Sequence, residues 1–174
     1  KGVFVGQRFI SKDGGKTIDG PQDAIFYVPR AVGSQGHAFH PGPLFMRNII
    51  QLADQSLLAL MCGWFDTDTH ESPVHGQNYR RSFLCRSTDE GHTWKYYSTI
   101  AYKPNWGSEG WNEGSLKRME EGKLIAAVRS GSDSQVWKDN PLCIFFSDDR
   151  GKTWSPPHRS GIDGVYPCLV QLSN

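Results

Sequence analysis

One short motif occurs three times in this 174-residue chain and constrains the fold more than any other feature. Its form is Ser-x-Asp-x-Gly-x-Thr followed by Trp or Ile, and the copies lie at 11–18, 87–94 and 147–154. The Asp carboxylate can accept hydrogen bonds from turn N–H groups, and the Gly supplies a positive φ. The Ser and Thr hydroxyls can close the turn from either side, and the Trp buries a large apolar surface beside it. Three copies in register predict a repeated β-hairpin unit.

A second repeat lies between the copies of the motif. Segments 48–60 and 115–128 are each predicted to form a strand, a tight turn and a second strand, and residues 167–174 begin the same pattern again. The equivalent positions in these three segments are separated by 67 and then 53 residues: Leu52, Met119 and Leu172. A four-stranded blade of a β-propeller, with its loops, fits that period.

Composition supports an all-β chain and narrows its partners. The 19 Gly and 10 Pro residues punctuate many short β-rich runs. A net charge of +1 without a cluster of Lys and Arg gives no reason to expect nucleic acid as a partner. The longest apolar runs, such as 57–62, are too short to span a bilayer.

The four cysteines are Cys62, Cys85, Cys143 and Cys168, and each lies in an apolar stretch. We interpret them as buried thiols that pack as small hydrophobes, although a disulfide stays open at this stage. No spacing of Cys, His or carboxylate residues matches a tight metal site, so no metal or cofactor is expected.

The repeated motif is the Asp-box, or bacterial neuraminidase repeat, and the chain resembles the sialidase superfamily of propellers. The first copy departs from the pattern because it has Ile18 where Trp is usual. The resemblance implies a six-bladed propeller of four-stranded antiparallel blades, of which this chain would form part. The expected divisions are the end of one blade at about 1–30, blades at 41–106 and 107–160, and the start of another at 165–174. The alternative is a small repeat protein that closes by association.

Within these blades we expect eight strands, near 45–53, 57–65, 80–87, 94–102, 113–120, 124–130, 141–147 and 153–158. The Asp boxes occupy the turns between third and fourth strands, and the first strand of a blade starts at the opposite face. If the turn at 121–122 centres its hairpin, Glu113 pairs with Ser130, and Arg129 lies one step away. A carboxylate and a guanidinium are therefore expected together at the mouth of the channel.

Segment 112–130 resembles the sialidase segment that carries the catalytic Glu and one arginine of a triad. The resemblance implies that Glu113 activates a tyrosine nucleophile and that Arg129 clamps the sugar carboxylate. Because their nucleophile is a tyrosine, sialidases are exceptions to the usual glycosidase mechanism, which uses two carboxylates. The alternative interpretation is an ordinary salt bridge between the inner strands.

Further candidates come from neighbouring segments. Arg47 aligns with the start of the Glu113 strand at the 67-residue offset and is a candidate substrate-binding residue, unless it points outward. Tyr166 faintly resembles the family's nucleophile segment, but only one Asp box separates it from Glu113, which favours an aromatic that lines the channel or packs in the core. The polar loop from residue 66 to residue 80 supplies Asp66 and Asp68 as candidate contacts to substrate, unless it is simply solvated. Trp111, like Trp106 and Trp137, could stack on a sugar ring or pack between blades.

The resulting functional hypothesis is a secreted or periplasmic exo-glycoside hydrolase of the sialidase type, acting on a terminal acidic sugar of a glycan. Two alternatives stay open. One is a non-catalytic Asp-box propeller that binds glycan or protein, and the other is a propeller hydrolase or lyase for another polysaccharide.

Overall fold

The computed structural model is all-β and describes residues 2–33, 42–72, 78–103, 109–131 and 141–172. One short 3-10 helix, η1 (Glu120–Gly122), interrupts the described strands. In chain order the strands are β1 (Val3–Ile10), β2 (Asp19–Tyr27), β3 (Ala31–Val32), β4 (Leu44–Gln51), β5 (Leu57–Phe65), β6 (Arg81–Ser87), β7 (Thr93–Ala101), β8 (Gly114–Arg118), β9 (Leu124–Arg129), β10 (Pro141–Ser147) and β11 (His158–Asp163).

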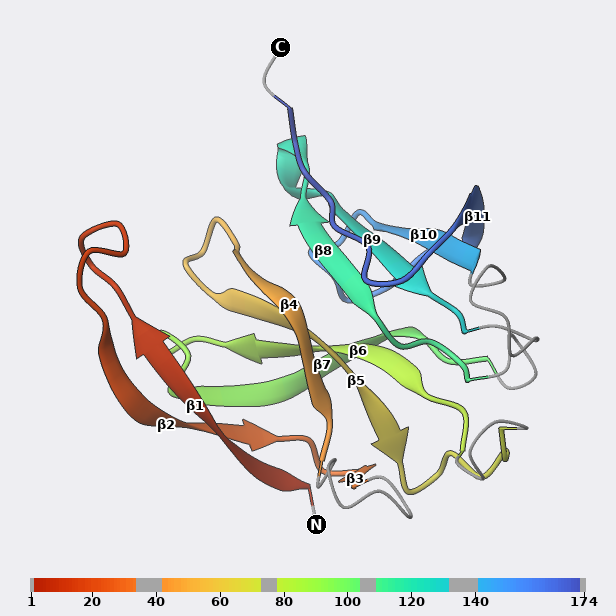
Figure 1. Ribbon diagram of the computed structural model, residues 1–174, viewed down its shortest axis with the longest axis horizontal. Coiled ribbons are helices and arrows are strands. Elements are labelled where there is room, and N and C mark those ends of the chain that lie inside the picture. Colours follow the sequence, from red (N-terminus) through yellow and green to blue (C-terminus); the bar gives the residue numbers. More distant parts are fainter. Residues whose placement is uncertain (1, 34–41, 73–77, 104–108, 132–140, 173–174) are drawn as a thin grey trace.

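These strands form two sheets (Figure 1). The four-stranded sheet is antiparallel, in the order β11-β10-β9-β8. The other sheet has the order β1-β2-β7-β6-β5-β3, and β4 also pairs with β5. Strands β4 to β7 therefore follow one another as an antiparallel meander, as the sequence predicts. Neither sheet closes on itself within the described part of the chain.

The hairpin of β1 and β2 lies beside the β4–β7 meander. Strand β2 runs parallel to β7, with Ile25 opposite Thr93 and Phe26 opposite Trp94. The Phe26 ring stacks on the Trp94 ring at 5.7 Å between centroids and 6° between planes. This contact joins the hairpin to the β4–β7 meander in one sheet.

The last strand of the four-stranded sheet begins later than predicted. We expected a strand at 153–158, but β11 starts at His158. The backbone of Ser155 still donates to Phe146 at 2.8 Å, and then Pro156 and Pro157 follow. Two prolines lack the N–H groups that a strand ladder requires, so pairing resumes only after them.

The predicted strand at about 165 is absent, and residues 164–172 run beside β8 without forming a ladder (Figure 1). Tyr166 has a φ of 51°, which breaks an extended backbone, and Pro167 cannot donate. The segment is held instead by a hydrogen bond of 3.1 Å from the Leu169 N–H to the Ser115 hydroxyl.

The three Asp boxes have the same hydrogen bonds. The Gly N–H donates to the Ser hydroxyl at 2.6–2.8 Å, and the Thr N–H donates to the Asp carboxylate at 2.9 Å. The Thr hydroxyl donates to the other carboxylate oxygen at 2.6–2.7 Å. These donors lower the pKa of Asp13 to about 2, with the Thr17 N–H as the largest cause. Trp94 and Trp154 each donate from the indole to the box Gly carbonyl, whereas Ile18 is exposed.

The main core lies between the two sheets. It gathers buried side chains from β4, β5, β8, β9 and β10 together with Trp111, and among them are Leu60, Leu116 and Phe145. Each is at most 1% exposed, and burial of a side chain of this size stabilises the fold by about 1.5–3 kcal/mol. A second cluster, around Met61, packs beneath the β1–β2 hairpin.

A polar side chain connects the first strands of the two meanders. The amide of Asn48 donates to the carbonyl of Leu116 and accepts from its N–H at 3.1 Å. Ser115 occupies the position equivalent to Asn48 at the 67-residue offset, and its hydroxyl accepts from Leu169, the equivalent of Leu116 at the 53-residue offset. The same contact thus recurs between successive repeats.

The cysteines are free, and three of them agree with the sequence interpretation. Cys62, Cys85 and Cys143 are buried, and burial raises the pKa of Cys62 and of Cys85 to about 12. Cys168 is exposed, because its segment lies on the surface of β8 rather than in a strand of a packed blade.

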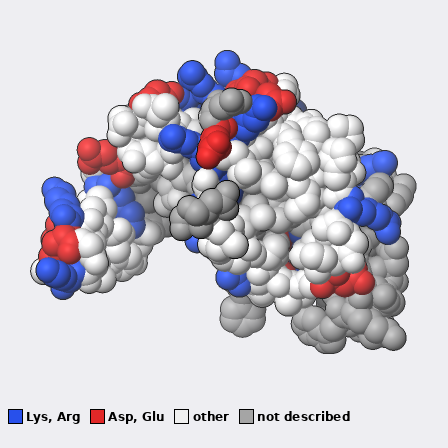
Figure 2. All heavy atoms as spheres, turned by 90° about the horizontal axis from the view of Figure 1, so that it is seen from above, with Lys and Arg blue, Asp and Glu red and all other residues white. Residues whose placement is uncertain are grey.

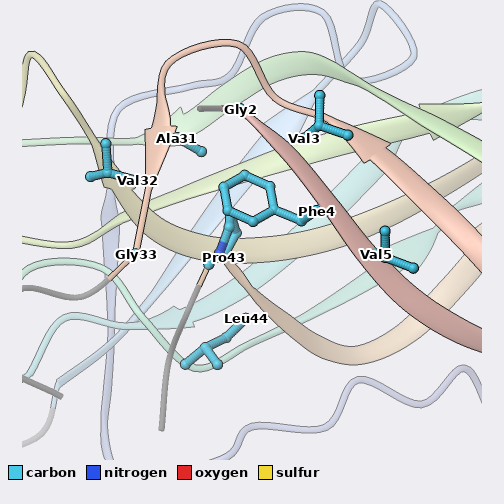
Figure 3. Close-up of a pocket in the computed structure, with 10 residues that line it drawn as sticks. Gly2, Val3, Phe4, Val5, Ala31, Val32, Gly33, Pro43 and Leu44 are labelled. Atoms are coloured by element: carbon cyan, nitrogen blue, oxygen red, sulfur yellow. The ribbon is translucent and has the colours of Figure 1, made fainter. Parts of the chain in front are cut away.

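An apolar hollow of about 660 Å³ lies between β1, β3 and the start of β4 (Figure 3). Phe4 and Pro43 lie at its centre, and the remaining lining residues are aliphatic or Gly. Since none of the lining side chains can exchange a proton, the hollow is not a candidate for catalysis.

Candidate functional site

Glu113 and Arg129 meet where β8 begins and β9 ends. The predicted register is wrong by one residue, because η1 lengthens the turn and sets Gly114 opposite Val128. The Arg129 N–H donates to the Glu113 carbonyl at 2.8 Å, so these two residues are directly opposite each other. Opposite residues of an antiparallel pair project to the same face. Accordingly the Arg129 Nε lies 3.0 Å from the Glu113 carboxylate.

The ion pair lies at the far end of its sheet from the Asp box. Arg129 pairs with Leu142 at the start of β10, whereas Ser147, which opens the third box, pairs with Leu124 at the other end. The ion pair and the third Asp box therefore lie at opposite ends of the same sheet.

Two further residues hold the Arg129 guanidinium. Its Nε donates to the Asn112 side chain at 3.0 Å, and one terminal nitrogen donates to Glu109 at 3.2 Å. Asn112 also donates to Glu109 at 2.6 Å and is itself buried. The Arg129 side chain is only 9% exposed, so the protein's own oxygen atoms surround it.

Glu109 and Arg80 also belong to this network, although no sequence motif predicts them as site residues. A terminal nitrogen of Arg80 lies 3.7 Å from the Glu109 carboxylate, and the Arg80 guanidinium covers the Trp64 ring at 5.1 Å from the centroid. The Arg80 N–H donates to the Glu109 carbonyl at 2.9 Å. Between them Gly110 has a φ of 76°, and a Cβ there would lie 2.5 Å from the Arg80 carbonyl oxygen. Only a backbone without a side chain fits this approach.

Tyr166 and Arg47 complete the cluster. The Tyr166 backbone N–H donates to the Glu113 carboxylate at 3.0 Å. The Arg47 guanidinium lies over the Tyr166 ring, 5.0 Å from its centroid. Both side chains are exposed, and Tyr166 is 54% exposed. Four of the sequence-predicted residues, Glu113, Arg129, Arg47 and Tyr166, therefore lie together.

The side chains of the other three predicted residues have different partners. Asp68 is 1% exposed and accepts from the Phe65 N–H and the Arg81 Nε at 2.8 Å each. Asp66 forms an exposed ion pair with Arg30 at 2.8 Å. Trp111 is 1% exposed and packs edge-on against Phe145, at 5.2 Å between ring centroids.

Burial therefore corrects two of these expectations. A carboxylate enclosed by the protein's own donors cannot also contact a sugar, so Asp68 has a structural position. Trp111 lies inside the core and cannot offer its face to a sugar ring, so its position is structural as well. Trp106 and Trp137, the other two candidates for stacking on a sugar, lie outside the described residues.

The surface in Figure 2 mixes Lys and Arg with Asp and Glu and carries no broad field of one sign. Among the described residues, no group of three or more His, Cys, Asp or Glu side chains is arranged to hold a metal ion. In the same part of the chain, no helix has the length and apolar character needed to cross a membrane.

Comparisons with known proteins agree with the repeat and the fold. A family model described as BNR/Asp-box repeat matches residues 145–156, which include the third box. A search of curated proteins gives no match. A protein of unknown function from Dyadobacter fermentans is 21% identical, with a TM-score of 0.63 over 94% of this chain and 40% of that one.

Two sialidases are similar in structure. The Hadza microbial sialidase Hz136 is 16% identical, with a TM-score of 0.54 over 86% of this chain and 24% of its own. The NanB sialidase from Streptococcus pneumoniae is 17% identical, with a TM-score of 0.53 over 91% of this chain and 19% of its own. The chain thus spans less than half of each of these structures. It carries the Asp-box repeat, and its fold is sialidase-like over the part that it covers.

Proposed function

We propose that this chain is part of a sialidase-type exo-glycoside hydrolase that removes a terminal acidic sugar from glycans. The complete enzyme would be a six-bladed propeller, secreted or periplasmic, with the Asp boxes on the face opposite the site. The Asp-box match and the structural similarity to two sialidases support this proposal.

The observation that carries the proposal is the contact of Glu113 with Arg129 at 3.0 Å, at the end of the sheet that faces away from the boxes. The Glu113 side chain is 15% exposed, so its carboxylate is fixed by the protein and still reachable from solvent. A positioned carboxylate of this kind can act as a general base. In the proposal Glu113 polarises a nucleophile at the mouth of the site.

Tyr166 has a different role from the one that the resemblance implies. Its hydrogen bond to Glu113 comes from the backbone N–H, while its ring faces the Arg47 guanidinium. We therefore assign Tyr166 to the wall of the site rather than to the nucleophile.

A second function, glycan binding without hydrolysis, is favoured by the position of Arg129. Its guanidinium is held by Glu113, Glu109 and Asn112, as a residue that maintains the shape of a binding surface would be. Turnover separates the two functions.

The test exposes the protein to a fluorogenic sialoside and compares it with Glu113→Gln. Hydrolysis that falls by about two orders of magnitude or more in this variant supports the enzyme, since a positioned base contributes about 10²–10⁴-fold. Glu120→Gln is the matched control, because Glu120 is exposed in the turn at the other end of the β8–β9 hairpin. Equal turnover by all three proteins removes Glu113 from the mechanism, and glycan binding without turnover favours the second function.

A further inference from the structure

A second carboxylate, that of Glu109, has contacts in two successive repeats. It accepts from a terminal nitrogen of Arg129 at 3.2 Å and from the Asn112 amide at 2.6 Å. A terminal nitrogen of Arg80, which precedes β6, lies 3.7 Å from the same carboxylate. The Glu109 side chain is 23% exposed, so protein groups shield most of it from water. Glu109 therefore connects the β4–β7 meander to the site on β8 and β9.

Two close backbone approaches fix the position of Glu109. Its carbonyl accepts from the Arg80 N–H at 2.9 Å. Gly131, which follows the end of β9, has a φ of 69°, and a Cβ there would lie 2.8 Å from the Glu109 Cβ. Because any larger residue would displace Glu109, this position requires glycine. The fold thus holds Glu109 both beside Arg80 and beside the end of β9.

The contacts of Glu109 help to orient the Arg129 guanidinium. The Arg129 Nε faces the Asn112 oxygen and the Glu113 carboxylate, both at 3.0 Å, and a terminal nitrogen faces Glu109. Since a guanidinium is a rigid plane, partners at Nε and at a terminal nitrogen restrict its rotation. Asn112 also accepts from the Glu113 N–H at 2.7 Å and donates to Glu109, so one buried amide links the two glutamates.

Glu109 also shares the charge of Arg129 with Glu113. A cation beside a carboxylate favours the ionised form and so weakens that carboxylate as a base. Arg129 faces both carboxylates, at 3.2 Å and 3.0 Å, and its side chain is 9% exposed, so water screens these interactions little. The negative charge of Glu109 therefore limits the attraction of Arg129 for Glu113.

We propose that Glu109 is a positioning residue of this site: it orients the Arg129 guanidinium and, by sharing its charge, keeps Glu113 available as a general base. The inference rests on the proposed function, because the base acts in that reaction. Glu109 itself needs no contact with the substrate, since it acts through Arg129.

The kinetic test compares Glu109→Gln and Glu109→Asp with the native protein on a fluorogenic sialoside. Glu109→Gln keeps a hydrogen-bond acceptor but removes the charge. We expect its kcat/KM to fall about tenfold and the acid limb of its pH profile to move about one unit to lower pH. Glu109→Asp keeps the charge on a shorter side chain, so its acid limb should stay at the native pH while the rate falls. Glu120→Gln, which changes an exposed carboxylate in η1, is the matched control and should alter neither quantity.

A second measurement, by NMR, needs no substrate. Restricted rotation gives the terminal N–H groups of a fixed guanidinium separate signals, whereas free rotation averages them. The Arg129 signals, assigned by their loss in Arg129→Lys, should be separate in the native protein and averaged in Glu109→Ala. Should Glu109→Ala fail to fold, Glu109→Gln takes its place, and faster averaging is expected because a neutral acceptor holds the guanidinium less strongly.

The outcomes separate positioning from a purely structural role. A residue that only ties two loops together would lower stability without moving the acid limb, so an unmoved acid limb in Glu109→Gln overturns the inference. Arg129 signals that stay as separate in the variant as in the native protein overturn it as well. If the native protein hydrolyses no sialoside, the hydrolase is refuted. Averaged Arg129 signals in the variant then sustain the positioning of Arg129 by Glu109, and separate signals overturn it.

Discussion

Glu113 and Arg129 lie directly opposite each other where β8 begins and β9 ends, and their side chains form an ion pair of 3.0 Å. The pair is mostly shielded from water, with side-chain exposures of 15% and 9%. Removal of one partner from such a pair leaves the other charge poorly solvated.

This geometry predicts an asymmetric response to substitution. Arg129→Met should lower the free energy of unfolding by about 3 kcal/mol, because it removes the cation that the Glu113 and Glu109 carboxylates share. Glu113→Gln keeps a hydrogen-bond acceptor for Arg129 and should cost about 1 kcal/mol. Urea denaturation of both variants checks the difference, and equal losses would show that the pair is no more than a surface contact.

The link between Asn48 and Leu116 should contribute to stability through both of its hydrogen bonds. Asn48→Ala leaves two backbone groups of a buried residue without partners, so we expect a loss of about 2 kcal/mol. Asn48→Asp can still accept from the Leu116 N–H but cannot donate to its carbonyl, and no recovery is expected. Ser115→Ala, at the equivalent position of the next repeat, removes one bond and should cost about 1 kcal/mol. Three small, equal losses in thermal melts would contradict the assignment.

The Asp boxes differ in how tightly they pack, although their turns are the same. Gly15 and Gly151 occupy the same box position with φ of 88° and 84°, but a Cβ would meet open space at Gly15 and Leu84 at 2.9 Å at Gly151. Gly15→Ala should therefore cost about 1 kcal/mol of backbone strain, and Gly151→Ala about 2–3 kcal/mol. A larger loss for Gly15→Ala in the same denaturation series would refute this view of the third box.

The Asp boxes also predict the behaviour in acid. Burial opposes ionisation of Asp89, but hydrogen bonds from Thr93 outweigh it and lower the pKa to about 2, below the ordinary value of 3.8. Because the folded-state pKa is the lower one, the ionised group stabilises the fold above about pH 4, and this contribution disappears as the pH falls towards 2. Stability measured across that range should fall less steeply in Asp89→Asn than in the native protein. Parallel curves of stability against pH for the two proteins would show that ionisation of Asp89 does not contribute to stability.

The cysteines give a simple test of the packing. Cys62, Cys85 and Cys143 are buried, whereas Cys168 is exposed. A disulfide reagent at mildly alkaline pH should modify one thiol quickly in the folded protein and all four in denaturant. Cys168→Ser should abolish the fast reaction, and rapid modification of a second thiol would contradict the described core.

Much of the fold follows from the sequence because its signals are local. The Asp box brings its own donors and acceptors, so Ser87, Asp89 and Thr93 specify their turn without help from distant residues. The repeated strand–turn–strand pattern likewise places β4 to β10 close to their predicted limits. The strand after the third box was misplaced because Pro156 and Pro157 delay pairing, an effect that the repeat pattern outweighed in the prediction.

The site was predictable only in part. The motif around Glu113 identifies its own strand, but the register that brings Arg129 opposite depends on η1, which the sequence does not distinguish from a tighter turn. Glu109 and Arg80 come from loops that meet only in three dimensions, through a backbone approach at Gly110. That glycine is the one local signal that could have pointed to them.

The most direct test of the central claim is a crystal structure of the protein soaked with the unsaturated analogue of N-acetylneuraminic acid. The account predicts density for the sugar beside the Glu113 carboxylate, at the end of the sheet that faces away from the Asp boxes. Density confined to another surface of the protein would contradict it.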